Sequence, residues 1–491
     1  MYTALIIAIG YFLILSVGTS LYLRKKVKSG RDFLTGSGAL AWPLVTAGFV
    51  LAPLGSGHTL SLWESSASYG ASVLWWGMIA GGLFVPLFLL WFGPWFRRLN
   101  VQTFPEGIGK IFGKEIGWLI SAVFPAQLIG ICIAEVLATS TAIYALGGGV
   151  IPFNPYCILI AVVLTILYII AGGIMQAAWM NLFNAVMLIL GSFVAIFMTG
   201  SWLSGHGGWE SVSNYYANAG TAWKTSILNF SPDVLFVIIF PCLILVIFMC
   251  SASQAQYQPM LLAKSESDIR RGVFWAAFIN SMATYPWVIA ALVGMSIPAI
   301  AESGARLSVP KLALMALPPW MVGILMIALL SATLSTTGPL ILASTHMIVH
   351  DIFKRAVNPK MSDRTMLILT RVMIFVIALM VIVPALKLQL VLSIFFWTFS
   401  FAIPVFGVYL IGMMWKVNRV AAWVTMLAGY AANFLWTFAP PTWLPSYMSL
   451  NVYPTIFTTV LFGIVLNLIL PGEPGYLRQL KAAEQKESIT A

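Results

Sequence analysis

The chain has 491 residues, of which 60% are hydrophobic and 8% are charged, and its mean hydropathy is +0.93. Soluble domains carry about 25% charged residues, so this composition excludes a soluble enzyme, a disordered protein and a secreted disulfide scaffold, and indicates a polytopic membrane protein. The net charge of +11 is typical of basic cytoplasmic loops, and no basic run with interleaved aromatics predicts nucleic-acid binding.

Thirteen apolar segments are long enough to cross a membrane as helices, which requires ~20 residues. The first is followed by Arg24, Lys25, Lys26 and Lys28, whereas a signal peptide carries its positive charge before the apolar stretch. We therefore expect a retained first helix whose N-terminus lies outside. The thirteen predicted spans are 2–23, 40–69, 71–95, 117–146, 154–172, 175–200, 233–257, 273–298, 319–349, 367–386, 389–414, 420–438 and 451–470.

The distribution of basic residues supports this orientation. With the N-terminus outside, 22 of the 26 Lys and Arg residues lie on the cytoplasmic side, including Arg371 near the inner start of the tenth span, and only Lys224, Arg306, Lys311 and Lys387 lie outside. Cytoplasmic loops are the ones enriched in Lys and Arg. We expect a multi-pass protein of the cell membrane with a cytoplasmic C-terminus.

Two of the spans contain residues that interrupt a helix. The second span has one proline and two glycines within Ala52–Gly57, and the seventh contains Pro241 and a polar run over Ser251–Gln258. Proline removes a backbone hydrogen bond and glycine is a poor helix former, although a simple kink is the alternative for the second span. The two spans lie five apart and run in opposite directions, which predicts two inverted repeats with a substrate site between their broken first helices.

The predicted fold is therefore an all-α membrane protein with one transmembrane transporter domain. Repeat 1 comprises spans 2–6 and repeat 2 comprises spans 7–11. The predicted boundaries are 1–37 for an extra N-terminal helix and loop, 38–200 for repeat 1, 233–414 for repeat 2, 415–470 for two extra helices and 471–491 for a cytoplasmic tail.

The ninth span carries a run of hydroxyl side chains. Ser335 and Thr336 are adjacent, and Ala332 lies one turn before Ser335. Hydroxyl and free carbonyl oxygens are the hard ligands that small cations prefer, so this segment is a candidate cation site. The alternative is that these hydroxyls bond back to the helix or join neighbouring helices.

A few polar side chains within spans are candidates for substrate contact or coupling. A carboxylate at bilayer depth is costly and indicates function, which singles out Glu64 in the second span and Glu135 in the fourth. The alternative for Glu64 is a solvated position in a vestibule, and the alternative for Glu135 is a packing role. His58 follows the break and could bond a substrate or sense pH. The remaining candidates, each of which could instead be packing, are Trp63, Gln127, Asn181, Gln254 and Trp397.

Several short motifs occur along the chain in a characteristic order. Through them the chain resembles the sodium:solute symporter family of proline, sugar, sialic acid, pantothenate and monocarboxylate carriers. The resemblance implies a leucine-transporter-type fold of inverted repeats. The motifs are Arg31–Leu34, Thr103–Glu106 with Phe112–Gly113, Trp179, Gln258 with Ala263–Ser265, Leu317–Pro319 and Leu330–Thr336.

The resemblance also implies a sodium site. Two carbonyls at the break of the second span, a carbonyl of the ninth span and two hydroxyls would coordinate the ion. By motif match these groups belong to Ala52, Gly55, Ala332, Ser335 and Thr336.

The chain departs from its relatives at three points. Asn181 closes a Trp-Met-Asn segment where many relatives have an aspartate, and Gly338 and Pro339 replace hydroxyl residues of an additional sodium site. Leu54 stands where some relatives have an aspartate at the break. We therefore expect the additional sodium site to be absent.

These observations predict a secondary active transporter that imports a small organic solute with sodium by alternating access. We expect sodium as the coupling ion, the lipid bilayer as surroundings, no cofactor and no obligate protein partner. Proton coupling through Glu64, Glu135 or His58, or uncoupled transport, is the alternative; a membrane sensor is less favoured because the tail is short. The sequence contains no HExxH, GxSxG or Walker motif, so nothing in it indicates an enzyme or an ATP-driven pump.

Overall fold

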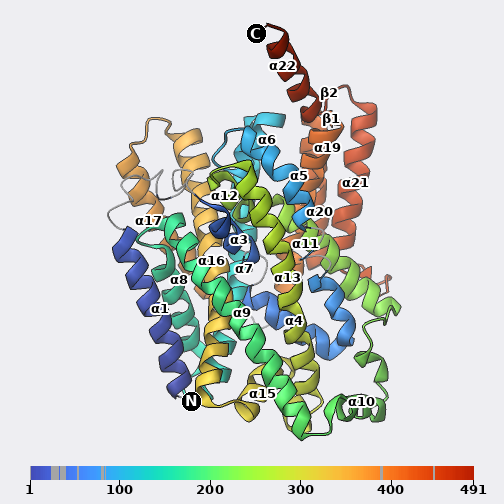
Figure 1. Ribbon diagram of the computed structural model, residues 1–491. Helices are drawn as coiled ribbons and strands as arrows, with labels where there is room; N and C mark the ends of the chain where they lie inside the picture. Colours follow the sequence, from blue (N-terminus) through green and yellow to red (C-terminus); the bar gives the residue numbers. More distant parts are fainter. Residues whose placement is uncertain are drawn as a thin grey trace.

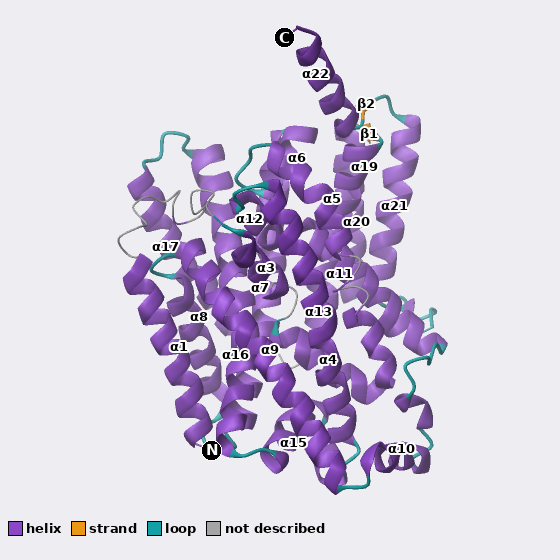
Figure 2. Cartoon of the chain, in the orientation of Figure 1, coloured by secondary structure: helices purple, strands orange, loops and turns teal. Residues whose placement is uncertain are grey.

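The computed structural model describes residues 2–23, 33, 40–51, 55–78, 82, 85–387, 391–445 and 448–490. It is a bundle of helices, and in these ranges the strands are confined to one short antiparallel pair at the base of the last helix (Figures 1 and 2). That pair is β1 (Lys416–Val417) and β2 (Glu473–Pro474). Ala52, a predicted sodium ligand, and Leu54 lie outside the described residues.

The helices occur in the following order. The N-terminal helix and the first half of the chain contain α1 (Tyr2–Leu23), α3 (Trp42–Leu51), α4 (Ser56–Tyr69), α5 (Val85–Arg98), α6 (Phe104–Phe112), α7 (Lys114–Leu146), α8 (Ile158–Ile169), α9 (Gly173–Gly205) and α10 (Gly208–Asn218). The second half contains α11 (Phe240–Ala252), α12 (Gln254–Leu262), α13 (Glu266–Met295), α14 (Pro298–Ala301), α15 (Ser308–Ala316), α16 (Pro319–His346), α17 (Asp363–Ala385), α18 (Val391–Ser400), α19 (Ala402–Met414), α20 (Arg419–Phe438), α21 (Val452–Ile469) and α22 (Tyr476–Thr490). Short 3₁₀ or π turns are η2 (Gly70–Val73), η4 (Phe153–Cys157), η5 (Ala222–Thr225), η6 (Val234–Ile239), η7 (Ala305–Leu307) and η8 (Met347–Val357).

Most predicted spans coincide with one helix or with consecutive helices; the third, 71–95, includes residues outside the described ranges and is represented by η2 and α5. Among the described residues, eight helices are long and apolar enough to cross a membrane alone, or up to nine if the bent pair α11–α12 counts as one span. The shorter apolar helices include Trp42–Leu51, which is one half of the second predicted span. The number of thirteen crossings and the boundaries of the repeats stay predictions.

Both predicted breaks separate two helices. In the second span α3 ends at Leu51 and α4 begins at Ser56, with the backbone of Gly55 extended. In the seventh span α11 and α12 are bent by 42°, and Ser253 between them is extended. The structure therefore favours a true break over a kink in the second span.

One half of each broken helix, α3 and α12, packs against the other. The backbone amide of Leu40 donates to Leu262 O at 2.9 Å, and the amide of Lys264 donates back to Leu40 O at 2.9 Å. A Cβ added to Gly48 of α3 would lie 3.0 Å from the ring of Pro259 in α12. Glycine at this position allows α3 and α12 to approach closely.

Helix α16 forms the centre of the bundle. Of its most apolar stretch, 94% is buried, against 28% for the peripheral α1. It packs against α9 on one side and α7 on another (Figure 1). Functional groups carried by α16 are therefore held by neighbours on all sides.

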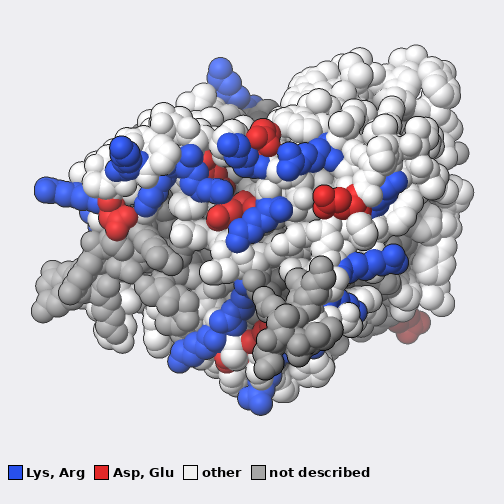
Figure 3. All heavy atoms as spheres, turned by 90° about the horizontal axis from the view of Figure 1, so that it is seen from above, with Lys and Arg blue, Asp and Glu red and all other residues white. Residues whose placement is uncertain are grey.

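Basic side chains gather at one end of the bundle. The C-terminus, α6 and α12 lie at one end, and the N-terminus, α10 and α15 lie at the other (Figure 1). Seen from the C-terminal end, many Lys and Arg side chains spread over the surface (Figure 3). This distribution agrees with the expected cytoplasmic location of that end, although the orientation in a membrane stays a prediction.

A loop structure closes the N-terminal end. The Tyr216 hydroxyl of α10 donates to Leu292 O of α13 at 3.0 Å, and the Trp75 indole donates to Ile227 O at 2.7 Å. The Lys224 ammonium donates to Ala67 O near the end of α4, and its partial burial lowers its pKa. The loop between α9 and α11 is thereby fastened to α4 and α13.

Candidate functional site

The hydroxyls of α16 meet the end of α3. Thr336 Oγ1 lies 2.9 Å from Leu51 O and 3.0 Å from Ala332 O, and Ser335 Oγ lies 2.9 Å from Ala332 O. All four residues are buried. The end of a helix leaves backbone carbonyls without helical partners, and here one of them faces the hydroxyl pair.

This cluster contains three of the five predicted sodium ligands. Ala332, Ser335 and Thr336 lie on one turn of α16, so their proximity follows from helix geometry, and both hydroxyls bond back to Ala332 O; their role as sodium ligands stays a prediction. The carbonyl of Gly55 accepts from the Thr59 amide at 3.1 Å and from its hydroxyl at 3.3 Å, so it is turned into α4, and its role as a ligand stays a prediction. The sequence analysis missed Leu51, because a backbone carbonyl has no side-chain signature and only its place at the end of α3 marks it.

The other side of the break faces Glu135. The Gly57 amide donates to Glu135 Oε2 at 3.0 Å, and the Ser56 hydroxyl lies 3.4 Å from the same oxygen. The Ser56 hydroxyl also contacts Thr333 Oγ1 of α16. Helix α16 therefore contacts the end of α3 through Thr336 and the beginning of α4 through Thr333.

Asn181 belongs to a neutral hydrogen-bond network. The Tyr168 hydroxyl donates to Asn181 Oδ1 at 2.5 Å and accepts from Asn184 Nδ2 at 2.9 Å. Ser331 of α16 donates to Asn184 Oδ1 at 3.2 Å. A Cβ added to Gly338 would lie 2.8 Å from the Tyr168 ring. The ring therefore fills the space beside Gly338, where relatives with an additional sodium site have a hydroxyl residue.

A narrow cavity of about 30 Å³ begins at Ser335. Its walls include Gly48 of α3, Asn181 of α9, Pro259 of α12 and Pro339 of α16. Pro339 has no amide hydrogen to donate to the carbonyl of Ser335, four residues earlier. The cavity therefore lies between Ser335 and the contact of α3 with α12.

Two aromatic contacts surround the first turns of α4. The ring of His58 lies 4.9 Å from that of Trp76, and the ring of Trp63 lies 6.3 Å from that of Trp287. The buried atoms His58 Nε2, Trp63 Nε1 and Trp76 Nε1 have no hydrogen-bond partner in the described part of the chain. Buried polar groups are normally paired, so these nitrogens are available to a ligand.

The remaining predicted candidates occupy different places. Glu64 pairs with Arg306 between α4 and η7, towards the N-terminal end of the bundle. Gln254 accepts from the Phe104 amide at 2.5 Å and joins α12 to α6. Trp397 packs against Phe401 and against Phe434 and Phe438 of α20. Gln127 is fully buried in α7, and neither of its amide atoms has a partner among the described residues.

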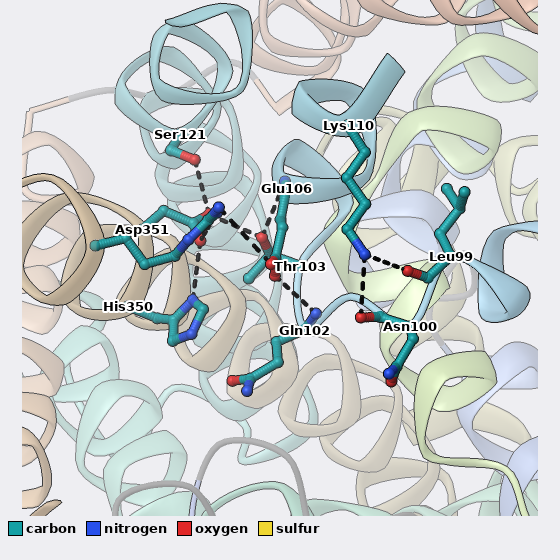
Figure 4. A network of polar contacts seen from close by, with 10 residues as sticks. Leu99, Asn100, Gln102, Thr103, Glu106, Lys110, Ser121, His350 and Asp351 are labelled. Carbon is teal, nitrogen blue, oxygen red and sulfur yellow. Dashed lines mark hydrogen bonds and ion pairs between the residues drawn. The ribbon is translucent and has the colours of Figure 1, made fainter. Parts of the chain in front are cut away.

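A buried polar network, which the sequence analysis did not identify, lies at the C-terminal end of the bundle (Figure 4). Asp351 of η8 accepts from Thr103 Oγ1 at 2.8 Å, from Ser121 Oγ at 2.8 Å and from His350 Nδ1 at 2.9 Å. Arg355 lies 3.7 Å from the carboxylates of both Asp351 and Glu106. The network fastens η8, and through it α16, to the loop before α6 and to α7.

Comparison with known proteins identifies relatives along most of the chain. The model of the "Sodium:solute symporter family" matches residues 33–429. A sodium/glucose cotransporter of Vibrio parahaemolyticus is 24% identical over 94% of this chain and 89% of its own length. Sodium/myo-inositol cotransporter 2 of Rattus norvegicus is 24% identical over 87% of this chain and 68% of its own length.

Solved structures show the same fold. A Na⁺-coupled sialic acid symporter in a substrate-bound, outward-open state, described as having a novel Na⁺ site, superposes with a TM-score of 0.78 at 16% identity, covering 96% of this chain and 99% of that one. MhsT in complex with L-phenylalanine gives 0.56 at 14% identity, covering 88% and 99%. The predicted leucine-transporter-type architecture is confirmed.

Proposed function

Because the chain belongs to the sodium:solute symporter family, we propose that it imports a small organic solute together with one sodium ion, which binds where α16 meets the end of α3. The ligands are Leu51 O, Ala332 O, Ser335 Oγ and Thr336 Oγ1. The observation that carries the proposal is the 2.9 Å approach of Thr336 Oγ1 to Leu51 O, since it brings oxygens of two separate helices to one point.

The chemistry of these groups suits sodium. They are neutral oxygen donors, which hard cations prefer, and unwound backbone in a membrane protein is placed where it lines a site. A hydroxyl can rotate. The two side chains, which now donate hydrogen bonds to carbonyls, can therefore turn their oxygen lone pairs towards an ion. Without a carboxylate among the ligands, we expect modest affinity.

The stoichiometry of one sodium follows from the surroundings of Asn181. Asn181 is neutral, Gly338 and Pro339 have no side-chain oxygen, and the ring of Tyr168 occupies the adjacent space. These features support the absence of an additional sodium site.

Coupling follows from the position of α16. Sodium between Ser335, Thr336 and Leu51 would fix the end of α3 against α16, and Thr333 on the same helix contacts Ser56 at the beginning of α4. A solute that binds beside α4 therefore depends on the same arrangement of the break. Such coupling is reciprocal: sodium and solute raise each other's affinity by the same factor.

The ion site can be tested on the purified protein without knowledge of the solute. We expect sodium chloride to raise the melting temperature relative to potassium chloride, and Thr336→Val to weaken this sodium-dependent increase. Thr370→Val is the matched control, because Thr370 is equally buried and, among the described residues, its hydroxyl bonds only Met366 O within α17. An equal sodium response in the parent and in Thr336→Val would contradict the site, and no sodium response at all would favour proton-coupled or uncoupled transport.

A further inference from the structure

The polar network in Figure 4 contains three side chains whose ligand atoms lie close enough together to hold a metal ion. Glu106, His350 and Asp351 each offer one such atom, and these atoms lie within 4.8 Å of one another. His350 Nδ1 and Asp351 Oδ1 are 2.9 Å apart. Zinc binds imidazole nitrogen and carboxylate oxygen at about 2.0–2.2 Å, which places neighbouring ligands of a tetrahedral site roughly 3.3 Å apart. The histidine and the aspartate are therefore close to the spacing that a shared ion needs, and Glu106 lies within reach.

Both carboxylates are held in place by other groups. Asp351 Oδ2 accepts from Thr103 Oγ1 and from Ser121 Oγ, each at 2.8 Å. Glu106 Oε2 accepts from the Gln102 amide at 2.9 Å. Carboxylates that bind metals are commonly oriented by such additional hydrogen bonds. Each of these side chains is thus fixed through one oxygen, and its second oxygen is the one that can bind an ion.

The charges of the network leave room for a further cation. Arg355 lies 3.7 Å from Asp351 Oδ1 and 3.7 Å from Glu106 Oε1, which is too far for a hydrogen bond. One guanidinium therefore faces two carboxylates. The side chain of Arg355 is 37% exposed, whereas that of Asp351 is 1% exposed, so Arg355 can turn into solvent while Asp351 stays buried. Buried charges are normally paired or bind metals, and a divalent ion would balance both carboxylates.

A second histidine lies beside this group. His346 is 1% exposed, and neither of its ring nitrogens has a hydrogen-bond partner among the described residues. Its ring centroid lies 5.2 Å from that of His350, one helical turn later. Two histidines four residues apart on one helix face are an arrangement that binds zinc. Because buried polar groups are normally paired, the unpartnered imidazole of His346 is an independent indication of a ligand at this place.

We propose that Glu106, His350 and Asp351 bind a divalent transition-metal ion such as Zn²⁺, with His346 as the fourth donor. Imidazole favours zinc and its neighbours, whereas magnesium and calcium take oxygen ligands. A neutral imidazole binds the ion through one nitrogen and keeps its proton on the other. The ion would join η8 to the beginning of α6 and hold the C-terminal end of the bundle in its packed arrangement. This site is separate from the proposed sodium site.

The test is a titration of the purified full-length protein, which carries no histidine tag and has been treated with a chelator. Zinc chloride is added in potassium chloride buffer without sodium, so that the result does not depend on the proposed sodium site. We expect saturable binding of one Zn²⁺ by calorimetry and a higher melting temperature, because an ion that binds only the folded protein stabilises it. Magnesium and calcium chloride should have neither effect. Absence of saturable zinc binding, or equal stabilisation by magnesium, would overturn the assignment.

Variants locate the ion. Glu106→Gln and His350→Gln should each weaken zinc binding at least tenfold. Glu115→Gln and His206→Gln are the same changes at exposed positions and should leave the zinc affinity unchanged. Glu106→Gln keeps an oxygen for the Gln102 amide, so its melting temperature without metal should stay near that of the parent. Parental zinc affinity in either Glu106→Gln or His350→Gln would show that the ion binds elsewhere.

Discussion

The hydroxyl of Thr336 donates to the carbonyl of Leu51 over 2.9 Å and joins the most buried helix of the bundle to the last residue of α3. One turn earlier on the same helix, Thr333 contacts Ser56 at the beginning of α4. The two ends of the interrupted helix are thus held by a single rigid element, and an ion at one end can affect a solute at the other.

The first prediction concerns the number of sodium ions. Solute-dependent sodium titrations should give a Hill coefficient of one, because Gly338 and Pro339 have no side-chain oxygen for a second ion and the ring of Tyr168 fills the space beside Gly338. Ser335→Ala should raise the sodium concentration for half-maximal binding about tenfold, equivalent to about 1.4 kcal/mol, and Asn181→Ala should change it much less. A Hill coefficient clearly above one, or equal effects of the two variants, would disprove the single-ion scheme.

The second prediction concerns the close contact of Gly55 with Glu135. Gly55→Ala places a methyl group 2.0 Å from Glu135 Oε1, and overpacking of this kind costs about 1–3 kcal/mol. We expect a lower melting temperature and the loss of solute binding, because the carboxylate must leave the end of α4. Gly200→Ala in α9, where nothing lies within 4 Å of the new Cβ, should be neutral or stabilising, since alanine favours a helix by about 1 kcal/mol over glycine. Unchanged solute affinity in Gly55→Ala would argue against the tight placement.

The breaks could be predicted from the sequence because they follow from local chemistry. Pro53, Gly55 and Gly57 lie close together in an apolar span, and polar residues cluster at the end of the seventh; such clusters disfavour a continuous helix, whereas single prolines such as Pro125 are accommodated inside helices. Ser335 and Thr336 were identifiable for the same reason, as adjacent hydroxyls in an apolar helix. The structure added their partner, Leu51, which no residue pattern distinguishes from any other leucine.

The neighbours of buried charges depended on tertiary packing. Glu135 was recognisable as a costly carboxylate, but its contact with Gly57 joins residues 78 positions apart. Asp351 was overlooked because it lies in a polar segment after the ninth span, where an acidic residue is ordinary. Its hydrogen bonds to Thr103 and Ser121 span 248 and 230 positions, and only the folded chain brings these groups together.

The third prediction concerns orientation. Cysteines introduced as Glu302→Cys and Lys360→Cys are at exposed positions near opposite ends of the bundle. In intact cells an impermeant thiol reagent should label the first and not the second, because the basic end of the protein is expected in the cytoplasm. The unmodified parent provides the background from native cysteines, three of which are buried. Labelling of Lys360→Cys from outside would invert the proposed topology.

The final prediction concerns the network around Asp351. Its carboxylate accepts three hydrogen bonds while 1% exposed, and hydrogen bonds to charged groups contribute about 1.5–3 kcal/mol each. Asp351→Asn has the same shape but loses the charge and turns one acceptor into a donor, so we expect a loss of about 2 kcal/mol or more in unfolding free energy, measured by denaturant titration. Asp363→Asn removes an exposed carboxylate 3.4 Å from Lys354, and exposed ion pairs contribute about 0–1 kcal/mol. Because the network fastens α16 through η8 to α6 and α7, Asp351→Asn should also weaken the sodium-dependent increase in melting temperature, whereas Asp363→Asn should preserve it. Equal stability losses in the two variants would show that the buried network contributes no more than a surface ion pair.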